Sequence, residues 1–121
     1  MAGINVYQSK HTSYVWGQTD AGSYGPRARY IGFRMGFSSA QGGKFSTRRV
    51  LITLEQLQRG GWWRKVGGGA YRTMTRFNTV SCSWSLRYRQ EGTYRVRVYM
   101  LNGTGRYEVT NSFRVYRHLI A

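Results

Sequence analysis

The sequence predicts an all-β fold, and two observations support that expectation. Apolar residues recur at every second position over residues 79–89 and again over 93–101, and a period of two places them on one face of a strand. Turn signals separate such segments at roughly even spacing along the chain. We therefore expect a single β domain, residues 1–121, built as an antiparallel immunoglobulin-like sandwich or small barrel of about seven or eight strands.

The first half of the chain predicts shorter and less regular strands. Expected strands are residues 4–7, 12–16, 29–37 and 45–54, with loops at 20–27 and 38–44. The run from Thr53 to Gln56 fits a helix capping box, and Gly60 with Gly61 would end a helix soon after it. One short helical turn over 54–59 is therefore the most helix that we expect.

The second half predicts a meander of three antiparallel strands, after one further strand at 71–77. The residues expected to face inward on the three strands are Val80, Cys82, Trp84, Leu86 and Tyr88, then Tyr94, Val96, Val98 and Met100, then Tyr107, Val109, Phe113 and Val115. Turns at 90–92 and 102–105 join them, because glycine and asparagine accept the positive φ of tight hairpins. Trp16 and Trp84 are expected in the core.

A short motif at the start of the second meander strand has a structural counterpart. Glu91-Gly92-Thr93-Tyr94, followed by alternating valines, resembles the tyrosine corner of immunoglobulin-like sandwiches. The pattern covers about a tenth of the chain, so it supports the architecture and names no family.

Arginine dominates the charged residues. The chain has sixteen arginines and three lysines against Asp20, Glu55, Glu91 and Glu108, and its formal net charge is +15. A compact domain with this much like charge favours a polyanionic partner, and the guanidinium group suits phosphate, sulfate and carboxylate. A GC-rich genome also favours arginine codons without any functional demand, so both interpretations stay open.

The predicted meander gathers several arginines on its outer face. If the turn at 90–92 is tight, Arg87 lies opposite Arg95, with Arg89 and Arg97 beside them. Across the next hairpin the expected pairs are Tyr99 with Glu108, Arg97 with Thr110 and Arg95 with Ser112. The predicted polyanion-binding residues are Arg87, Arg89, Arg95, Arg97 and Arg114, assisted by Tyr99 and Tyr116.

This face has two interpretations. Arginine interleaved with tyrosine is the chemistry of single-stranded nucleic-acid grooves, and an acidic glycan would suit the same surface. The alternative is a solvated basic face that blunts the sheet edges. If the side chains point outward, the double substitution of Arg95→Glu with Arg97→Glu abolishes polyanion binding and leaves the fold intact.

A second candidate contact site lies in a glycine frame. Residues 60–69 surround Trp62, Trp63, Arg64 and Lys65 with five glycines, which predicts a mobile loop. Adjacent tryptophans on a strand point to opposite faces, so one is expected to meet a glycan, a lipid headgroup or a protein. The alternative places one tryptophan in the core and the other over a sheet edge.

The sequence offers little catalytic chemistry. Its four carboxylates are too scattered to predict a glycosidase pair, and Cys82, His11 and His118 lack metal-ligand spacing, so we expect no cofactor or metal. Cys82 is expected to face inward as an inert thiol. One catalytic alternative is a metal-free ribonuclease using His11 and His118, whose imidazoles would have to lie within roughly 7 Å of each other.

We therefore expect a non-catalytic binding module for a polyanion, either nucleic acid or an acidic cell-surface glycan. The main alternative is a protein-interaction subunit, such as a secreted bacterial adaptor or a bacteriocin-like component. No apolar run approaches the roughly 18 residues of a membrane span, and Cys82 stands alone, which excludes an internal disulfide. The start of the chain does not resemble a signal peptide, and we favour a secreted mature chain over a cytoplasmic protein.

Overall fold

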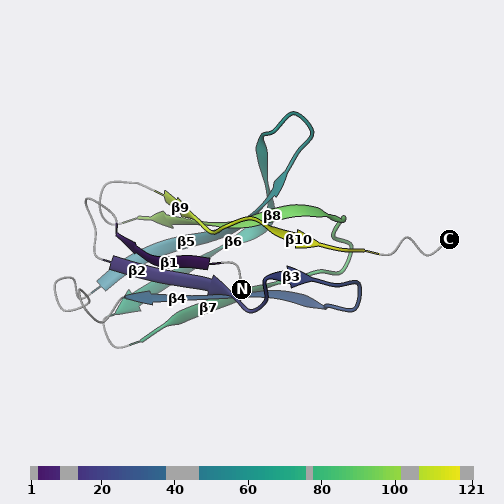
Figure 1. The fold of residues 1–121 in the computed structure, drawn as a ribbon. Helices are drawn as coiled ribbons and strands as arrows, with labels where there is room; N and C mark the ends of the chain where they lie inside the picture. The colour runs from purple at the N-terminus through teal and green to yellow at the C-terminus, as the bar shows by residue number, and fades with distance from the viewer. Residues whose placement is uncertain (1–2, 9–13, 38–46, 76–77, 102–106, 118–121) are drawn as a thin grey trace.

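The computed structural model describes residues 3–8, 14–37, 47–75, 78–101 and 107–117, and these form two mainly antiparallel sheets packed as a β-sandwich, not as a closed barrel (Figure 1). The strands are β1 (Gly3–Gln8), β2 (Tyr14–Thr19), β3 (Ser23–Tyr24), β4 (Tyr30–Phe37), β5 (Thr47–Leu57), β6 (Trp63–Thr75), β7 (Val80–Ser85), β8 (Gly92–Met100), β9 (Tyr107–Val109) and β10 (Phe113–Val115). The smaller sheet has the order β1-β2-β4-β7. The larger has the order β3-β10-β8-β5-β6, with β9 paired to β8 and β3 running parallel to β10.

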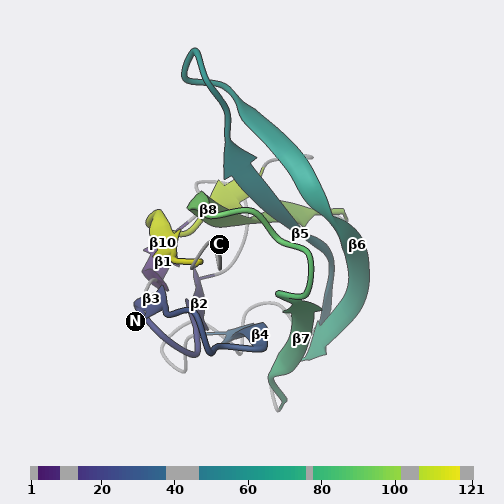
Figure 2. The ribbon, with the colours of Figure 1, turned by 90° about the vertical axis from the view of Figure 1, so that its right-hand side faces the viewer.

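The core lies between the two sheets and follows the period of two (Figure 2). Strand β8 buries its alternate residues Tyr94, Val96, Val98 and Met100, as predicted. The buried residues opposite them are Val15, Ile31, Phe33, Met35, Phe37, Val80 and Trp84. Trp16 was expected in the core as well, but it is only half-buried on the outer side of β2, with the Arg34 guanidinium 5.6 Å from its ring centroid.

The predicted three-stranded meander is wrong at its first turn, because the chain crosses between the sheets after β7. Strand β7 pairs with β4, whereas β8 pairs with β5. The crossing buries Leu86 and leaves Tyr88 exposed with a positive φ of 66°, so Tyr88 does not face inward as expected. Crossing at this point lets Trp84 and Tyr94 bury their rings from opposite sheets.

The tyrosine-corner pattern is present at this crossing. The Tyr94 hydroxyl donates a hydrogen bond of 2.6 Å to the Gln90 carbonyl, four residues upstream and just before β8 begins. This is the geometry of a tyrosine corner, which joins the two sheets of immunoglobulin-like sandwiches. The hydroxyl end of a buried ring thereby obtains a partner, and the start of β8 is tied to the preceding turn.

The predicted helical turn at 54–59 does not form, and the segment instead completes β5. Residues up to Leu57 pair with β6, and residues up to Gln56 pair with β8 on the other side. Partners on both sides satisfy the backbone better than one isolated helical turn would. The structure contains no helix within its described residues.

The glycine frame is part of a strand and not the mobile loop that we expected. Strand β6 contains Gly67, Gly68 and Gly69, and it has two more residues than β5 between the Glu55–Lys65 and Ile52–Ala70 pairs. The extra residues form β-bulges, which bend a strand and increase its twist. Glycine is required here, since a Cβ on Gly67 would lie 2.7 Å from the Leu54 Cβ atom.

The predicted last strand is divided into β9 and β10. In β10 the pairing of Phe113 with Tyr94 agrees with the predicted register, but in β9 Tyr107 lies opposite Tyr99, one residue away from the prediction. The break is stabilised by Thr110, whose amide donates to the Val96 carbonyl and whose hydroxyl accepts from the Val96 amide. A shift of one residue reverses the side-chain direction, so Tyr107 is exposed instead of facing inward.

Candidate polyanion-binding face

Aromatic and basic side chains gather on the outer surface of the larger sheet. Strand pairing aligns Tyr107, Tyr99, Leu51 and Tyr71 in one row across β9, β8, β5 and β6, and aligns Arg95, Glu55 and Lys65 in another. We call this surface the arginine–aromatic face; its residues are Arg49, Leu51, Thr53, Glu55, Trp63, Lys65, Tyr71, Arg95, Arg97, Tyr99 and Tyr107. Its inner counterparts on the same strands are core residues, because strand side chains alternate.

A buried carboxylate organises the centre of this face. Glu55 is only 4% exposed. Its Oε1 atom accepts from the Arg95 Nε at 2.8 Å, and its Oε2 atom lies 3.4 Å from the Arg97 Nη1. A carboxylate is costly to bury unless it is paired, so Glu55 and the two arginines form one unit with a net positive charge.

Each arginine of this unit also lies on an aromatic ring. The Arg95 guanidinium carbon is 4.2 Å from the Trp63 ring centroid, and that of Arg97 is 3.9 Å from the Tyr107 centroid. Arg49 lies 5.4 Å from the Tyr71 centroid in the same way. A guanidinium over a ring gains a cation–π contact and still directs its N–H donors to other groups, as Arg95 and Arg97 do toward Glu55.

The face is hollowed beside Arg97. A cavity of about 190 Å³ is lined by Leu51, Thr53, Glu55, Lys65, Arg97 and Tyr99. Gly69 borders this region, and a Cβ there would lie 2.6 Å from the Leu51 Cδ1 atom. Within the described residues, the Arg97 Nε is buried without a hydrogen-bond partner, so this arginine has an unused donor close to the hollow.

The structure brings only part of the predicted site together. Arg95, Arg97 and Tyr99 lie on the arginine–aromatic face. Arg114 pairs with Thr93 and so points outward on the same side of the larger sheet, as predicted, but it lies on β10 beyond β8, where its Nη1 donates to the Thr93 hydroxyl and its Nη2 lies 4.0 Å from Glu91. Tyr116 is exposed beside it, 5.9 Å from the Arg114 guanidinium.

Arg87 and Arg89 do not join this face. The predicted pairing of Arg87 with Arg95 is wrong, because β7 belongs to the smaller sheet. Arg87 lies over the Tyr88 ring, and Arg89 donates to the backbone carbonyls of Ser85 and Val66. Sequence reasoning missed Trp63 as a stacking partner and Glu55 as the central anion. The alternation of Thr53 and Glu55 with apolar residues along β5 was the sequence signal that Glu55 faces outward.

Several arginines are used within the sandwich instead. Strands β6 and β7 lie at facing sheet edges, and side chains bridge them: Arg72 Nε donates to the Ser81 carbonyl, Arg89 Nη1 to the Val66 carbonyl and Trp84 Nε1 to the Gly68 carbonyl. At one end of the sandwich Arg117 donates to the carbonyls of Gly25, Pro26, Ala28 and Leu86. We call Arg72, Arg89 and Arg117 the seam arginines.

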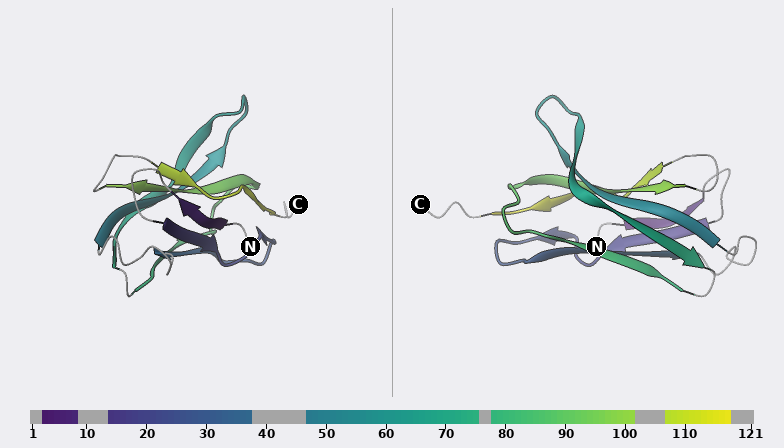
Figure 3. Two further views of the ribbon diagram at one scale, coloured as in Figure 1. Left: turned by 60° about the vertical axis from the view of Figure 1, so that its left-hand side comes forward. Right: turned by 180° about the vertical axis from the view of Figure 1, so that it is seen from behind.

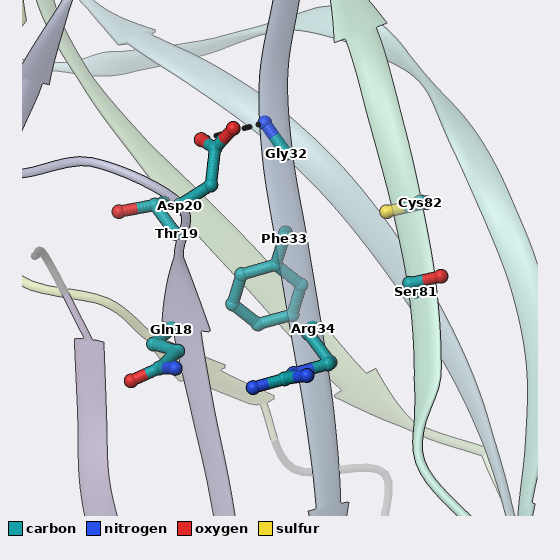
Figure 4. A pocket seen from close by; sticks show the side chains of 8 residues that line it. All are labelled: Gln18, Thr19, Asp20, Gly32, Phe33, Arg34, Ser81 and Cys82. Carbon is teal, nitrogen blue, oxygen red and sulfur yellow. Dashed lines mark hydrogen bonds between the residues drawn. The ribbon is translucent and has the colours of Figure 1, made fainter.

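The smaller sheet has a hollow of its own, of about 500 Å³ (Figure 4). It is lined by Gln18, Thr19, Asp20, Gly32, Phe33, Arg34, Ser81 and Cys82. Asp20 turns its carboxylate to the Gly32 amide, 3.0 Å away, and also accepts from the Tyr24 hydroxyl. Burial raises the pKa of Cys82 to about 11, so this thiol is protonated at neutral pH and is not an activated nucleophile.

The two histidines that the sequence singled out fall outside what the structure describes. His11 and His118 of the ribonuclease alternative lie outside the described residues. Among the described residues, no group of three or more histidine, cysteine, aspartate or glutamate side chains is placed to hold a metal ion. No helix in the described part of the chain is long and apolar enough to cross a membrane. Comparison with known proteins found no matching family model and no matching curated protein.

Proposed function

We propose that this domain binds a polyanion without catalysing a reaction, and that the polyanion is single-stranded nucleic acid held on the arginine–aromatic face. The observation that supports the proposal is the stacking of Arg95, Arg97 and Arg49 on aromatic rings of one sheet surface. Guanidinium groups suit the geometry of phosphate, and these three lie together with aromatic rings on one surface. Pairing cations with rings is the usual chemistry of single-strand binding surfaces.

Exposed rings at both ends of the aromatic row favour nucleic acid over a sulfated glycan. Tyr71 is 56% exposed and Tyr107 is 49% exposed, and they flank Tyr99 and Leu51. Bases stack on such rings without regard to sequence. The charges of the face favour a polyanion of either kind, since Arg49, Lys65, Arg95 and Arg97 outnumber Glu55.

The test is a fluorescence-anisotropy titration of the whole chain with single-stranded RNA, single-stranded DNA and a sulfated glycan over a salt series. Tyr71→Ala and Tyr107→Ala are each expected to weaken nucleic-acid binding about tenfold, the loss of one stacked base. Tyr30→Ala is the matched control, because Tyr30 is 58% exposed on β4 of the other sheet. This control is expected to leave nucleic-acid affinity unchanged.

A second pair of variants tests the cations. Lys65→Gln is expected to reduce the slope of log affinity against log salt by about 0.7, the value for one phosphate contact on a single strand. Arg34→Gln removes the same charge from the smaller sheet and is expected to leave the slope unchanged.

Equal effects of Tyr71→Ala and Tyr30→Ala on nucleic-acid affinity would exclude this face as the binding site. A preference for the sulfated glycan would replace nucleic acid with an acidic glycan as the ligand.

A further inference from the structure

The β5–β6 hairpin projects beyond the sandwich as a narrow finger (Figures 1 and 3). Its base lies at the β-bulges of β6, where Gly67 packs against Leu54 and Trp84 too closely for any Cβ. Bulges of this kind redirect a strand. The bend therefore follows from the glycines of β6, and it carries residues 57–62 away from the body of the domain.

The tip of the finger is a defined turn. Gly61 donates its amide to the Gln58 carbonyl at 3.0 Å, and Gln58 donates its amide to the Trp62 carbonyl at 2.7 Å. Gly60 and Gly61 have φ values of +97° and +88°, which glycine adopts without strain. The two glycines thus fix a compact turn that presents its neighbours at the end of the hairpin.

Apolar and basic side chains are exposed together at this tip. Trp62 is 56% exposed and Leu57 is 38% exposed, while Arg59 and Arg64 are also exposed. Trp63 differs, because it lies under Arg95 on the arginine–aromatic face. The sequence from residue 56 to 64 contains no carboxylate, so nothing within the tip opposes an anionic surface.

We propose that the hairpin tip binds an anionic lipid bilayer, with Trp62 inserted at the level of the headgroups and Arg59 and Arg64 against lipid phosphates. Tryptophan is enriched at this depth because its ring is apolar and its N–H is polar. Basic residues near an anionic leaflet strengthen such binding. The projecting hairpin lets the tip reach a bilayer while the body of the domain stays clear of it.

A bilayer suits this tip better than a protein partner does. A stable protein interface needs about 20–30 residues on each side, with a rim that excludes water from the central aromatic residue. The tip from residue 57 to 62 offers six residues on a narrow projection. A bilayer surrounds an inserted side chain by itself and requires no complementary rim.

The experiment is co-sedimentation of the full chain with vesicles of phosphatidylcholine alone and of phosphatidylcholine with about 30% phosphatidylglycerol, at about 0.15 M salt. Trp62→Ala is expected to weaken binding to the anionic vesicles about tenfold. Arg59→Gln and Arg64→Gln are each expected to weaken it about fivefold. Tyr30→Ala removes an equally exposed aromatic ring from β4 and is expected to have no effect.

Insertion has its own readout, independent of affinity. Lipids that carry a quencher at the headgroup are expected to quench the tryptophan fluorescence of the wild-type protein. They are expected to quench Trp62→Phe much less, although this variant still sediments. Equal sedimentation of the wild type and Trp62→Ala would overturn the proposal and indicate binding by diffuse charge. Absence of binding to the anionic vesicles would also overturn it, and the tip would then be a candidate protein contact.

Discussion

The arginines of the arginine–aromatic face and the seam arginines have different structural roles within one small domain. Arg95 and Arg97 stack on Trp63 and Tyr107 and share the buried carboxylate of Glu55. The seam arginines donate instead to backbone carbonyls at the edges and one end of the sandwich. The number of arginines in a sequence therefore does not measure the size of a binding surface.

The two groups of arginines also differ in how much each of their contacts contributes to the stability of the fold. A hydrogen bond from a charged group contributes about 1.5–3 kcal/mol to stability, whereas an exposed cation–π contact contributes about 0.5–1 kcal/mol. Arg117 makes several hydrogen bonds from its charged guanidinium to backbone carbonyls at once. The fold needs the seam arginines for its own stability. It needs the face arginines mainly because Glu55 is buried beneath them.

Charge reversal on the face tests that distinction with the largest expected effect. Arg95→Glu combined with Arg97→Glu places two new carboxylates beside Glu55, so the fold is not expected to survive intact, contrary to the expectation from sequence alone. Removing the partner of a buried charge costs about 3–5 kcal/mol, and repulsion adds to this cost. Urea denaturation should show a loss of at least about 4 kcal/mol in the free energy of unfolding.

Two further variants identify Glu55 as the cause. Glu55→Gln added to the reversed pair is expected to recover about half of the lost stability, because the buried charge is gone. Arg34→Glu combined with Arg87→Glu changes the net charge equally at exposed sites over Trp16 and Tyr88. It is expected to cost at most about 1 kcal/mol. A similar loss in both double variants would mean that Glu55 has no special role.

Removing a seam arginine is expected to give the opposite combination of effects. Arg117→Gln leaves the carbonyls of Ala28 and Leu86 without their charged donor and should lower the free energy of unfolding by about 2 kcal/mol. Nucleic-acid affinity should fall no more than in the control Arg87→Gln, which removes the same charge from an exposed site. The distinction between seam arginines and face residues would be wrong if Arg117→Gln weakened nucleic-acid binding as strongly as Tyr71→Ala.

The alternation of apolar residues was enough to predict the β class, most strands and the inward face of β8. It also located the tyrosine corner, since Tyr94 begins a strand directly after a turn. These features depend on local spacing, which the sequence displays directly. The short helical turn that the sequence allowed at 54–59 does not form, because pairing of β5 on both sides outweighs a local capping signal.

The composition of the face depended on pairing between distant strands. Arg87 was assigned to it because a short turn suggested a hairpin, whereas the chain crosses to the other sheet after β7. Tyr107 was assigned to the core because the register shift at Thr110 has no marker in a single sequence. Glu55 lies forty residues from Arg95, so no local pattern could reveal that this carboxylate pairs with two of the predicted cations.

The smallest expected effect concerns the thiol beside the seam. Burial raises the pKa of Cys82 from 9.0 to about 11, and the charge of Arg72 opposes that shift. The folded state thus holds this proton more tightly than the unfolded state, so its contribution to stability is present below about pH 9 and is lost as the pH rises toward 11. At pH 8 a disulfide reagent should react about a hundredfold more slowly with the folded than with the urea-unfolded protein.

Arg72→Gln distinguishes two roles for this seam arginine. If Trp84 and Arg89 keep β6 and β7 together, removing the cation raises the pKa of Cys82 further, and the reaction slows by about twofold. That is the result we expect. A faster reaction would mean that the Arg72–Ser81 bond holds the seam closed, and that its loss opens the sandwich at this edge. Arg72 would then resemble Arg117 in holding the fold together, and its charge would matter less than the carbonyl that it binds.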